Sequence, residues 1–105
     1  MSNARIALTT AGSADEARRI AQALVDRRLA ACVNIVPQVE SIFRWQGKIE
    51  NASEFLLLIK TEAGVFDDLC EAVKELHSYQ LPECVMLEIR AGSSEYLGWI
   101  EENVG

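Results

Sequence analysis

The spacing of apolar and polar residues changes several times along the chain, and each change marks a boundary between predicted elements. Residues 5–10 alternate and then give way to an Ala-Gly pair, which predicts a short strand ending in a turn. Ser13 followed by Glu16 is typical of a helix start, and the apolar positions behind it recur at helical spacing until near Arg28. The first third therefore predicts a strand followed by an amphipathic helix.

A long hairpin is predicted next. From residue 32 the period becomes two, and one face is expected to carry the apolar residues Val33, Ile35, Val39, Phe43 and Trp45. Pro37 removes a backbone donor midway, so we expect a bend or bulge there. A Gln-Gly turn leads into a returning arm that ends in the apolar run 55–59. Residues 32–61 thus form two paired arms.

The second half repeats the helix and strand signals. An apolar stripe at helical spacing follows residue 62 and ends near His77, and Pro82 marks the end of that helix. Residues 84–90 predict the last core strand, and Ser93 or Ser94 can cap a short final helix. The order predicts an α+β, ferredoxin-like fold, a split βαβ with an antiparallel sheet and helices on one face, in a single domain spanning 1–105.

The hairpin is longer than a four-stranded sheet of this size can pair internally. The overhanging arm is rich in large apolar residues, among them Ile42, Phe43 and Trp45. Exposed strand edges and apolar surface both favour pairing with another chain. The pattern therefore predicts self-association.

Charge and composition narrow the classes of molecule that the protein is expected to bind. Sixteen acids against ten bases give a net charge of -6, which disfavours nucleic acid and anionic membranes and favours cations. Three cysteines without a C-x-x-C pair, and the lack of a signal-peptide core or membrane span, predict a cytoplasmic protein with free thiols. No nucleophile, phosphate-loop or H-E-x-x-H motif occurs, so we expect no enzyme activity.

Five stretches closely resemble the CutA divalent-cation-tolerance family: residues 31–35, 41–48, 58–61, 77–83 and 92–100. The resemblance implies a homotrimer whose long hairpins reach across to neighbours, similar to PII signalling proteins. It also implies a role in tolerance of divalent cations, copper above all. Two positions depart from the family pattern. Ser78 replaces a usual proline, which predicts a less rigid loop, and Phe43 replaces a common tyrosine, which removes a hydroxyl.

Copper favours thiolate and imidazole ligands, which makes Cys32 and His77 candidate metal ligands. Glu83 is the third candidate, because it offers a carboxylate in the loop that follows His77. No cofactor is required, and Cu(II) or another divalent cation is the expected ligand. The alternatives stay open, because free cysteines are commonly small buried hydrophobes and a histidine at a helix end is favoured by the helix dipole.

Residues at subunit boundaries form the second candidate set. Lys60, Tyr79 and Trp45 are expected in a cleft between subunits, and Lys60 could pair with Glu83 or bind an anion. The predicted trimer interface comprises Ile42, Phe43, Trp45 and Trp99. Two functions follow: a metal-responsive trimer, or a PII-like signalling or scaffold trimer that binds a small anion or a partner protein in its clefts.

Overall fold

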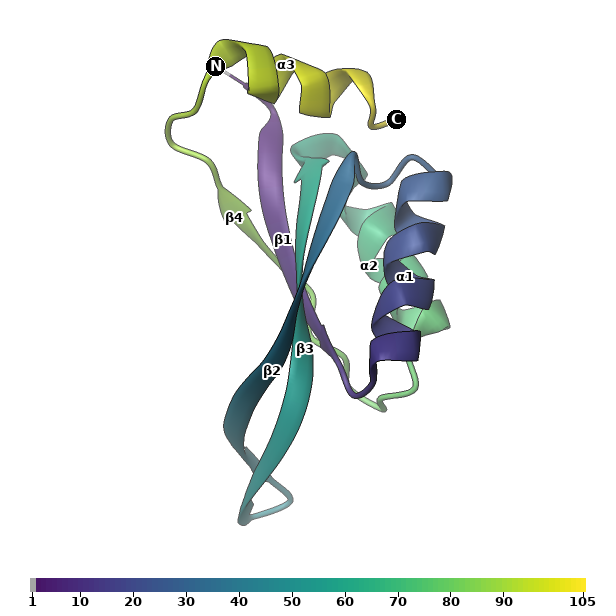
Figure 1. Ribbon diagram of the computed structural model, residues 1–105, viewed down its shortest axis with the longest axis vertical. Helices are drawn as coiled ribbons and strands as arrows, with labels where there is room; N and C mark the ends of the chain where they lie inside the picture. Colours follow the sequence, from purple (N-terminus) through teal and green to yellow (C-terminus); the bar gives the residue numbers. More distant parts are fainter. Residues whose placement is uncertain (1) are drawn as a thin grey trace.

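The computed structural model describes residues 2–105 as a four-stranded antiparallel sheet in the order β2-β3-β1-β4 (Figure 1). This arrangement confirms the predicted ferredoxin-like α+β fold. In chain order the elements are β1 (Ala4–Ala11), α1 (Ala14–Asp26), β2 (Cys32–Trp45), β3 (Lys48–Glu62), the 3-10 helix η1 (Ala63–Val65), α2 (Phe66–Leu76), β4 (Val85–Glu88) and α3 (Ser94–Glu102).

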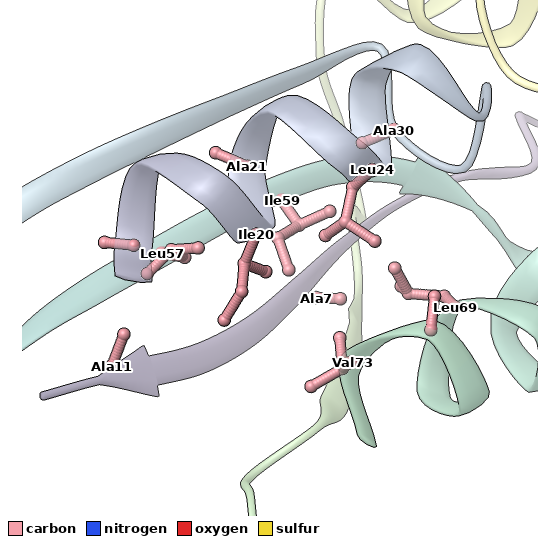
Figure 2. Packing of buried hydrophobic residues seen from close by; sticks show 12 residues of the cluster. Ala7, Ala11, Ile20, Ala21, Leu24, Ala30, Leu57, Ile59, Leu69 and Val73 are labelled. Atoms are coloured by element: carbon pink, nitrogen blue, oxygen red, sulfur yellow. The ribbon is translucent and has the colours of Figure 1, made fainter. Parts of the chain in front are cut away.

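Helices α1 and α2 cover one face of the sheet. Helix α1 begins where predicted, because Ser13 Oγ accepts the backbone N–H of Glu16 at 3.1 Å. Its apolar stripe packs against alternate residues of the sheet and against α2 (Figure 2). The largest side chains of this core are Ile20, Leu24, Leu57, Ile59, Leu69 and Val73, all fully buried. Each such side chain contributes roughly 1.5–3 kcal/mol of burial free energy.

Helix α3 crosses the end of the sheet that carries the chain's N-terminal region (Figure 1). Ile100 and Val104 pack on Ala4 in a second, smaller core. The guanidinium of Arg28 donates to the carbonyl oxygens of Glu102 and Gly105, each at 2.8 Å. The C-terminal segment is therefore fixed to the end of α1.

The hairpin of β2 and β3 extends well beyond the other strands (Figure 1). Residues 55–62 of β3 pair with β1, whereas residues 48–54 pair only with β2. Seven residues of extended chain span about 23 Å. A two-stranded ribbon of this kind is marginally stable by itself in water. The overhanging hairpin predicted from the sequence is thus present as an arm that needs further contacts.

A β-bulge interrupts β2 beside Pro37, which confirms the predicted irregularity. Val36 pairs with Leu56, but Val39 pairs with Glu54, so β2 holds one extra residue at this point. The bulge corrects the predicted face of β2. Because the extra residue reverses the alternation, Val39, Phe43 and Trp45 lie on the face opposite to Val33 and Ile35 rather than sharing it.

The second face of the sheet lies on the side away from α1 and α2. Its alternate positions are apolar and only partly buried or exposed, and Val36, Val85 and Leu87 are 38%, 46% and 50% exposed. We call this the open face. Its apolar members are Ile6, Leu8, Val36, Leu56, Leu58, Val85 and Leu87.

The bulge generates a prediction about backbone strain. Gln38 has φ of 60°, a left-handed conformation that costs a non-glycine residue roughly 1–2 kcal/mol. Gln38→Gly should therefore stabilise the protein by up to about 1 kcal/mol, after the greater flexibility of unfolded glycine is subtracted. Gln22→Gly, on the exposed side of α1, is the matched control and should destabilise by about 1 kcal/mol. Urea unfolding measures the free energy of unfolding of both variants. An equal loss of stability in the two variants would contradict the assignment of backbone strain to Gln38.

Candidate functional site

A hollow of about 370 Å³ lies between the base of the hairpin arm and the loop that follows α2. We call it the hairpin hollow; its lining includes Phe43, Trp45, Ala52, Glu54, Tyr79 and Leu81. An adjoining depression shares Phe43, Glu54 and Tyr79 and adds Thr10, Ser41 and Glu83. Phe43 and Glu54, the two strand residues that line both the hollow and the depression, lie on the open face beyond its apolar part.

A charge-assisted hydrogen bond joins the two sides of the hollow. Tyr79 Oη donates to Glu54 Oε2 at 2.6 Å, and Glu54 is 7% exposed. Burial alone would raise the pKa of Glu54, but the hydroxyls of Ser41, Tyr79 and Thr10 favour the charged form and bring the pKa below its usual value. Burial and the contact with Glu54 raise the pKa of Tyr79 well above its usual value. The pair is thus a carboxylate and a neutral phenol.

Gly12 leaves room for this contact. A Cβ atom at position 12 would lie 3.1 Å from Tyr79 Oη, closer than side-chain atoms usually approach. A larger residue there would require the phenol to shift by a few tenths of an ångström. The turn after β1 is therefore fitted to the Tyr79 side chain.

His77 holds the loop to the sheet. Its side chain is fully buried, Nε2 lies 2.5 Å from the carbonyl oxygen of Thr10, and Nδ1 accepts the backbone N–H of Tyr79 at 3.2 Å. This arrangement fits a neutral imidazole with its proton on Nε2. Both ring nitrogens are occupied, so in this conformation His77 positions the loop and offers no free ligand atom to a metal.

Ser78 supplies a contact that the proline usual in the resembled family cannot make. Its backbone N–H donates to Glu16 Oε2 at 2.8 Å, and proline has no N–H. Burial alone would raise the pKa of Glu16, but its hydrogen bonds with Ser78 lower it overall. The loop loses the proline ring, but this contact with α1 offsets part of that loss.

The three predicted metal ligands do not converge within one chain. Cys32 pairs across the sheet with Lys60, which pairs with Ile6, whereas His77 contacts Thr10. Ile6 and Thr10 are four residues apart on β1, which corresponds to a distance of about 13 Å along the strand. Glu83 lines the depression beside the hairpin hollow. Among residues 2–105, no group of three or more His, Cys, Asp or Glu side chains is placed to hold a metal ion.

The predicted cleft residues are only partly brought together. Trp45 and Tyr79 both line the hairpin hollow. Lys60 lies further along the sheet and donates from Nζ to Asn34 Oδ1, so no contact with Glu83 is made among the described residues. Glu54 was missed, because an acid just before the apolar run resembles an ordinary solvated strand position. The available signal was that Glu54 alternates with Leu56 and Leu58 and therefore shares their face of β3.

The predicted interface residues are exposed in the single chain. Ile42 is 70% exposed near the tip of the hairpin, and Phe43 and Trp45 follow at 42% and 37%. Trp99 lies on α3, stacked on Tyr96 with 5.6 Å between ring centroids. Figure 1 shows that α3 and the hairpin tip occupy opposite ends of the molecule. Neither α3 nor the other described helices have the length and apolarity needed to cross a membrane.

Comparison with known sequences gives one consistent result. The sequence model of the family described as CutA1 divalent ion tolerance protein matches residues 5–103. The chain is 53% identical over 100 residues to the divalent-cation tolerance protein CutA of Thermus thermophilus, covering 95% of this chain and 97% of that protein. It is 41% identical over 96 residues to protein CutA of Homo sapiens, covering 91% of this chain but 54% of the human protein. The chain thus spans about half the length of this relative.

Solved structures agree with the sequence comparison. The divalent cation tolerance protein of Thermus thermophilus superposes with a TM-score of 0.95 at 52% identity, covering 97% of this chain and 99% of that one. CutA1 from Oryza sativa superposes with a TM-score of 0.94 at 37% identity, covering 97% of this chain and 94% of that one. The relatives' names differ in location: one from Arabidopsis thaliana is called chloroplastic, and a structure from Archaeoglobus fulgidus is called periplasmic.

The Tyr79–Glu54 contact generates a prediction with a pH dependence. Tyr79→Phe should destabilise the protein by about 2 kcal/mol at pH 7, because it removes a hydrogen bond to a buried carboxylate. Since the folded pKa of Glu54 is lowered, its stabilisation is present above the unfolded value near 4.5 and is lost as the pH falls through the folded value. The difference between wild type and Tyr79→Phe should therefore shrink below about pH 4.5.

Chemical unfolding at several pH values and one protein concentration measures this difference. Tyr96→Phe is the matched control, because Tyr96 is 45% exposed on α3. Its effect should be small at every pH. A Tyr79→Phe effect that stays constant from pH 7 to pH 3 would show that the hydroxyl acts through packing and not through the charge of Glu54.

Proposed function

The chain belongs to the CutA1 divalent ion tolerance protein family, and on this premise we propose that it contributes to divalent-cation tolerance as a cytoplasmic homotrimer. In this proposal cations, copper(II) among them, bind where subunits meet. The observation that carries it is the open face, an apolar sheet surface that lies away from α1 and α2. The cations are cargo of the assembly, and no catalytic step is assigned to any residue.

The open face supports assembly on energetic grounds. The apolar run 55–59 alternates between the two faces of β3, so Leu57 and Ile59 are buried under the helices while Leu56 and Leu58 lie on the open face. Together with β1 and β4, these residues form a contiguous apolar surface, which is unusual on a monomeric protein. Each leucine or valine of this face that a second subunit covers contributes on the order of 1 kcal/mol.

The hairpin arm supports a ring rather than a two-fold dimer. Its exposed apolar residues near the tip, Ile42 and Ile49, lie at one end of the molecule, and Tyr96 and Trp99 lie at the other. Contact between two different surfaces is heterologous, and repeated heterologous contacts close into a ring when the rotation permits. The edge strands β2 and β4 are also free to pair with neighbouring arms. The resemblance to the family supplies the number three.

Cation binding rests on the acidic character of the chain and of the hollow. The net charge is -6, and Glu50, Glu54 and Glu83 line the hairpin hollow and its neighbour. One chain does not complete a metal site among its described residues, so the proposal requires ligands from a second subunit. Glu83 is exposed at the depression, and Cys32 lies on the open face, where a neighbour approaches in the proposed assembly. His77 acts in this scheme by holding the loop.

The alternative function, a PII-like scaffold that binds a small anion in the same clefts, has less support. The acids lining the hollow repel anions, and Lys60, the candidate cationic group, lies elsewhere on the sheet. A partner protein seated on Phe43 and Trp45 remains the second candidate, because these aromatic side chains are 42% and 37% exposed. The cytoplasmic assignment is supported by three free cysteines in the described chain.

Assembly is tested by the mass in solution. Light scattering at micromolar concentration should give about three times the 11.6 kDa of one chain. Leu87→Glu should yield smaller species, because it places a charge on the open face. Val25→Glu is the matched control: Val25 is 43% exposed on α1, away from the open face, and the mass should not change. A monomeric wild type would refute the proposal, as would equal effects of both variants.

Cation binding is tested by calorimetric titration with copper(II) at pH 7. Glu83→Gln and Cys32→Ser should each weaken binding about tenfold or more, while Glu95→Gln on α3 should leave it unchanged. Leu87→Glu separates the two parts of the proposal, because a site shared between subunits must lose affinity when the assembly dissociates. Affinity that survives dissociation would place the cation site within one chain and contradict the shared site.

A further inference from the structure

Two cysteines that the proposed function does not use lie in contact. Cys70 is on α2 and Cys84 directly precedes β4, and their Sγ atoms are 3.1 Å apart. Both side chains are partly buried, and Cys84 packs against the main core. Fourteen positions separate them in the sequence, so the fold brings them together.

The distance between the sulfurs is close to that of a bond. A disulfide requires about 2.05 Å, so an approach of roughly 1 Å would join the two residues. The third thiol is no competitor. Cys32 is on β2, which β3 and β1 separate from β4, a lateral distance of about 14 Å. Within one chain, Cys70 and Cys84 are therefore each other's partners.

We propose that Cys70 and Cys84 are a reversible dithiol–disulfide pair, a modification site whose oxidation pins the loop of residues 77–83 to α2. The oxidant is a hydroperoxide. The thiolate of one of these cysteines attacks one oxygen of hydrogen peroxide, the O–O bond breaks, and a sulfenic acid and water form once a proton is taken up. The thiol of the other cysteine then attacks the oxidised sulfur, the S–O bond breaks and a second water leaves. Two thiols lose two electrons, and one hydrogen peroxide is reduced to two waters.

The surroundings of Cys84 favour its protonated form. Burial is the main cause that raises the pKa of Cys84, and the hydrogen bond with Cys70 and the nearby charge of Glu83 add to it. The positive charge of Lys74 opposes this rise in part. The two sulfurs are already in contact, so whichever thiol is oxidised first has its resolving partner beside it.

Oxidation acts on the candidate site through the loop that the bond closes. The segment between the two cysteines contains Tyr79, which lines the hairpin hollow, and Glu83, which lines the adjoining depression. It also contains His77, which holds the loop to the sheet. A bond from α2 to the far end of this segment restricts its freedom, as ring closure does in any chain. The site would be more rigid in the oxidised protein. This inference does not rest on cation binding or on the number of subunits.

The test counts thiols in the Cys32→Ser variant, which removes the one uninvolved cysteine. After peroxide treatment, quenching and denaturation, the protein should take up no maleimide and be lighter by two hydrogen atoms than the reduced form, which takes up two. Dithiothreitol should restore both thiols. Cys70→Ser and Cys84→Ser in the same background should form no internal disulfide. In oxidised wild type, digestion should yield one linked pair of peptides containing positions 70 and 84.

Two results would overturn the proposal. Cys70 and Cys84 that both remain free, or that gain oxygen atoms without a link, would show that contact does not lead to a bond. Hydrogen exchange supplies the second readout: amides of residues 77–83 should exchange at least severalfold more slowly in the oxidised Cys32→Ser protein. Unchanged exchange in a protein with the disulfide formed would remove the effect on the loop.

Discussion

The structure depends on a sheet that is apolar on both faces and covered by α1 and α2 on only one. Strand β3 pairs with both β1 and β2 and carries large apolar side chains on alternate sides. Leu57 and Ile59 anchor the core, and Leu56 and Leu58 face outward. A strand of this composition is ordinarily found where both faces are buried. The chain therefore carries an apolar surface that its own helices leave uncovered, and the hairpin and the hollow lie beside it.

The hairpin hollow lies where the four-stranded part of the sheet becomes a two-stranded arm. Glu54 is the last residue of β3 before the segment that pairs with β1, and Tyr79 reaches it from the loop after α2. Through His77 the same loop is tied to the carbonyl of Thr10, near the end of β1. The polar contacts thus join the base of the arm to the loop after α2 and to the end of β1.

Local signals allowed much of the fold to be predicted from the sequence. The capping pair Ser13 and Glu16 fixed the start of α1, and Pro37 indicated the bulge. Periodicity failed just beyond Pro37, because alternation cannot reveal that one extra residue reverses the faces of a strand. The open face was also missed, since a run of apolar residues does not tell whether one or both sides are covered within the chain.

The candidate site was predictable only in part, because its contacts join residues distant in sequence. Of the three residues predicted for a cleft between subunits, Trp45 and Tyr79 line the hollow, whereas the strand register places Lys60 further along the sheet. Cys32, predicted as a metal ligand from copper chemistry, pairs with Lys60 and lies away from His77. Glu54 meets Tyr79 across 25 positions, a contact that no local pattern contains.

In the proposed assembly the interface between subunits lies beside the acidic hollow, and this has a thermodynamic consequence. If a cation needs ligands from two subunits, it binds the assembled form and not the separate chains, so binding must favour assembly. Linkage makes the effect reciprocal: assembly must raise the affinity for the cation by the same factor. Carboxylates such as Glu50 and Glu83 repel one another when brought together, and a bound cation relieves that repulsion. The apolar open face and the acidic hollow then act together, because one supplies the attraction between subunits and the other makes it sensitive to cations.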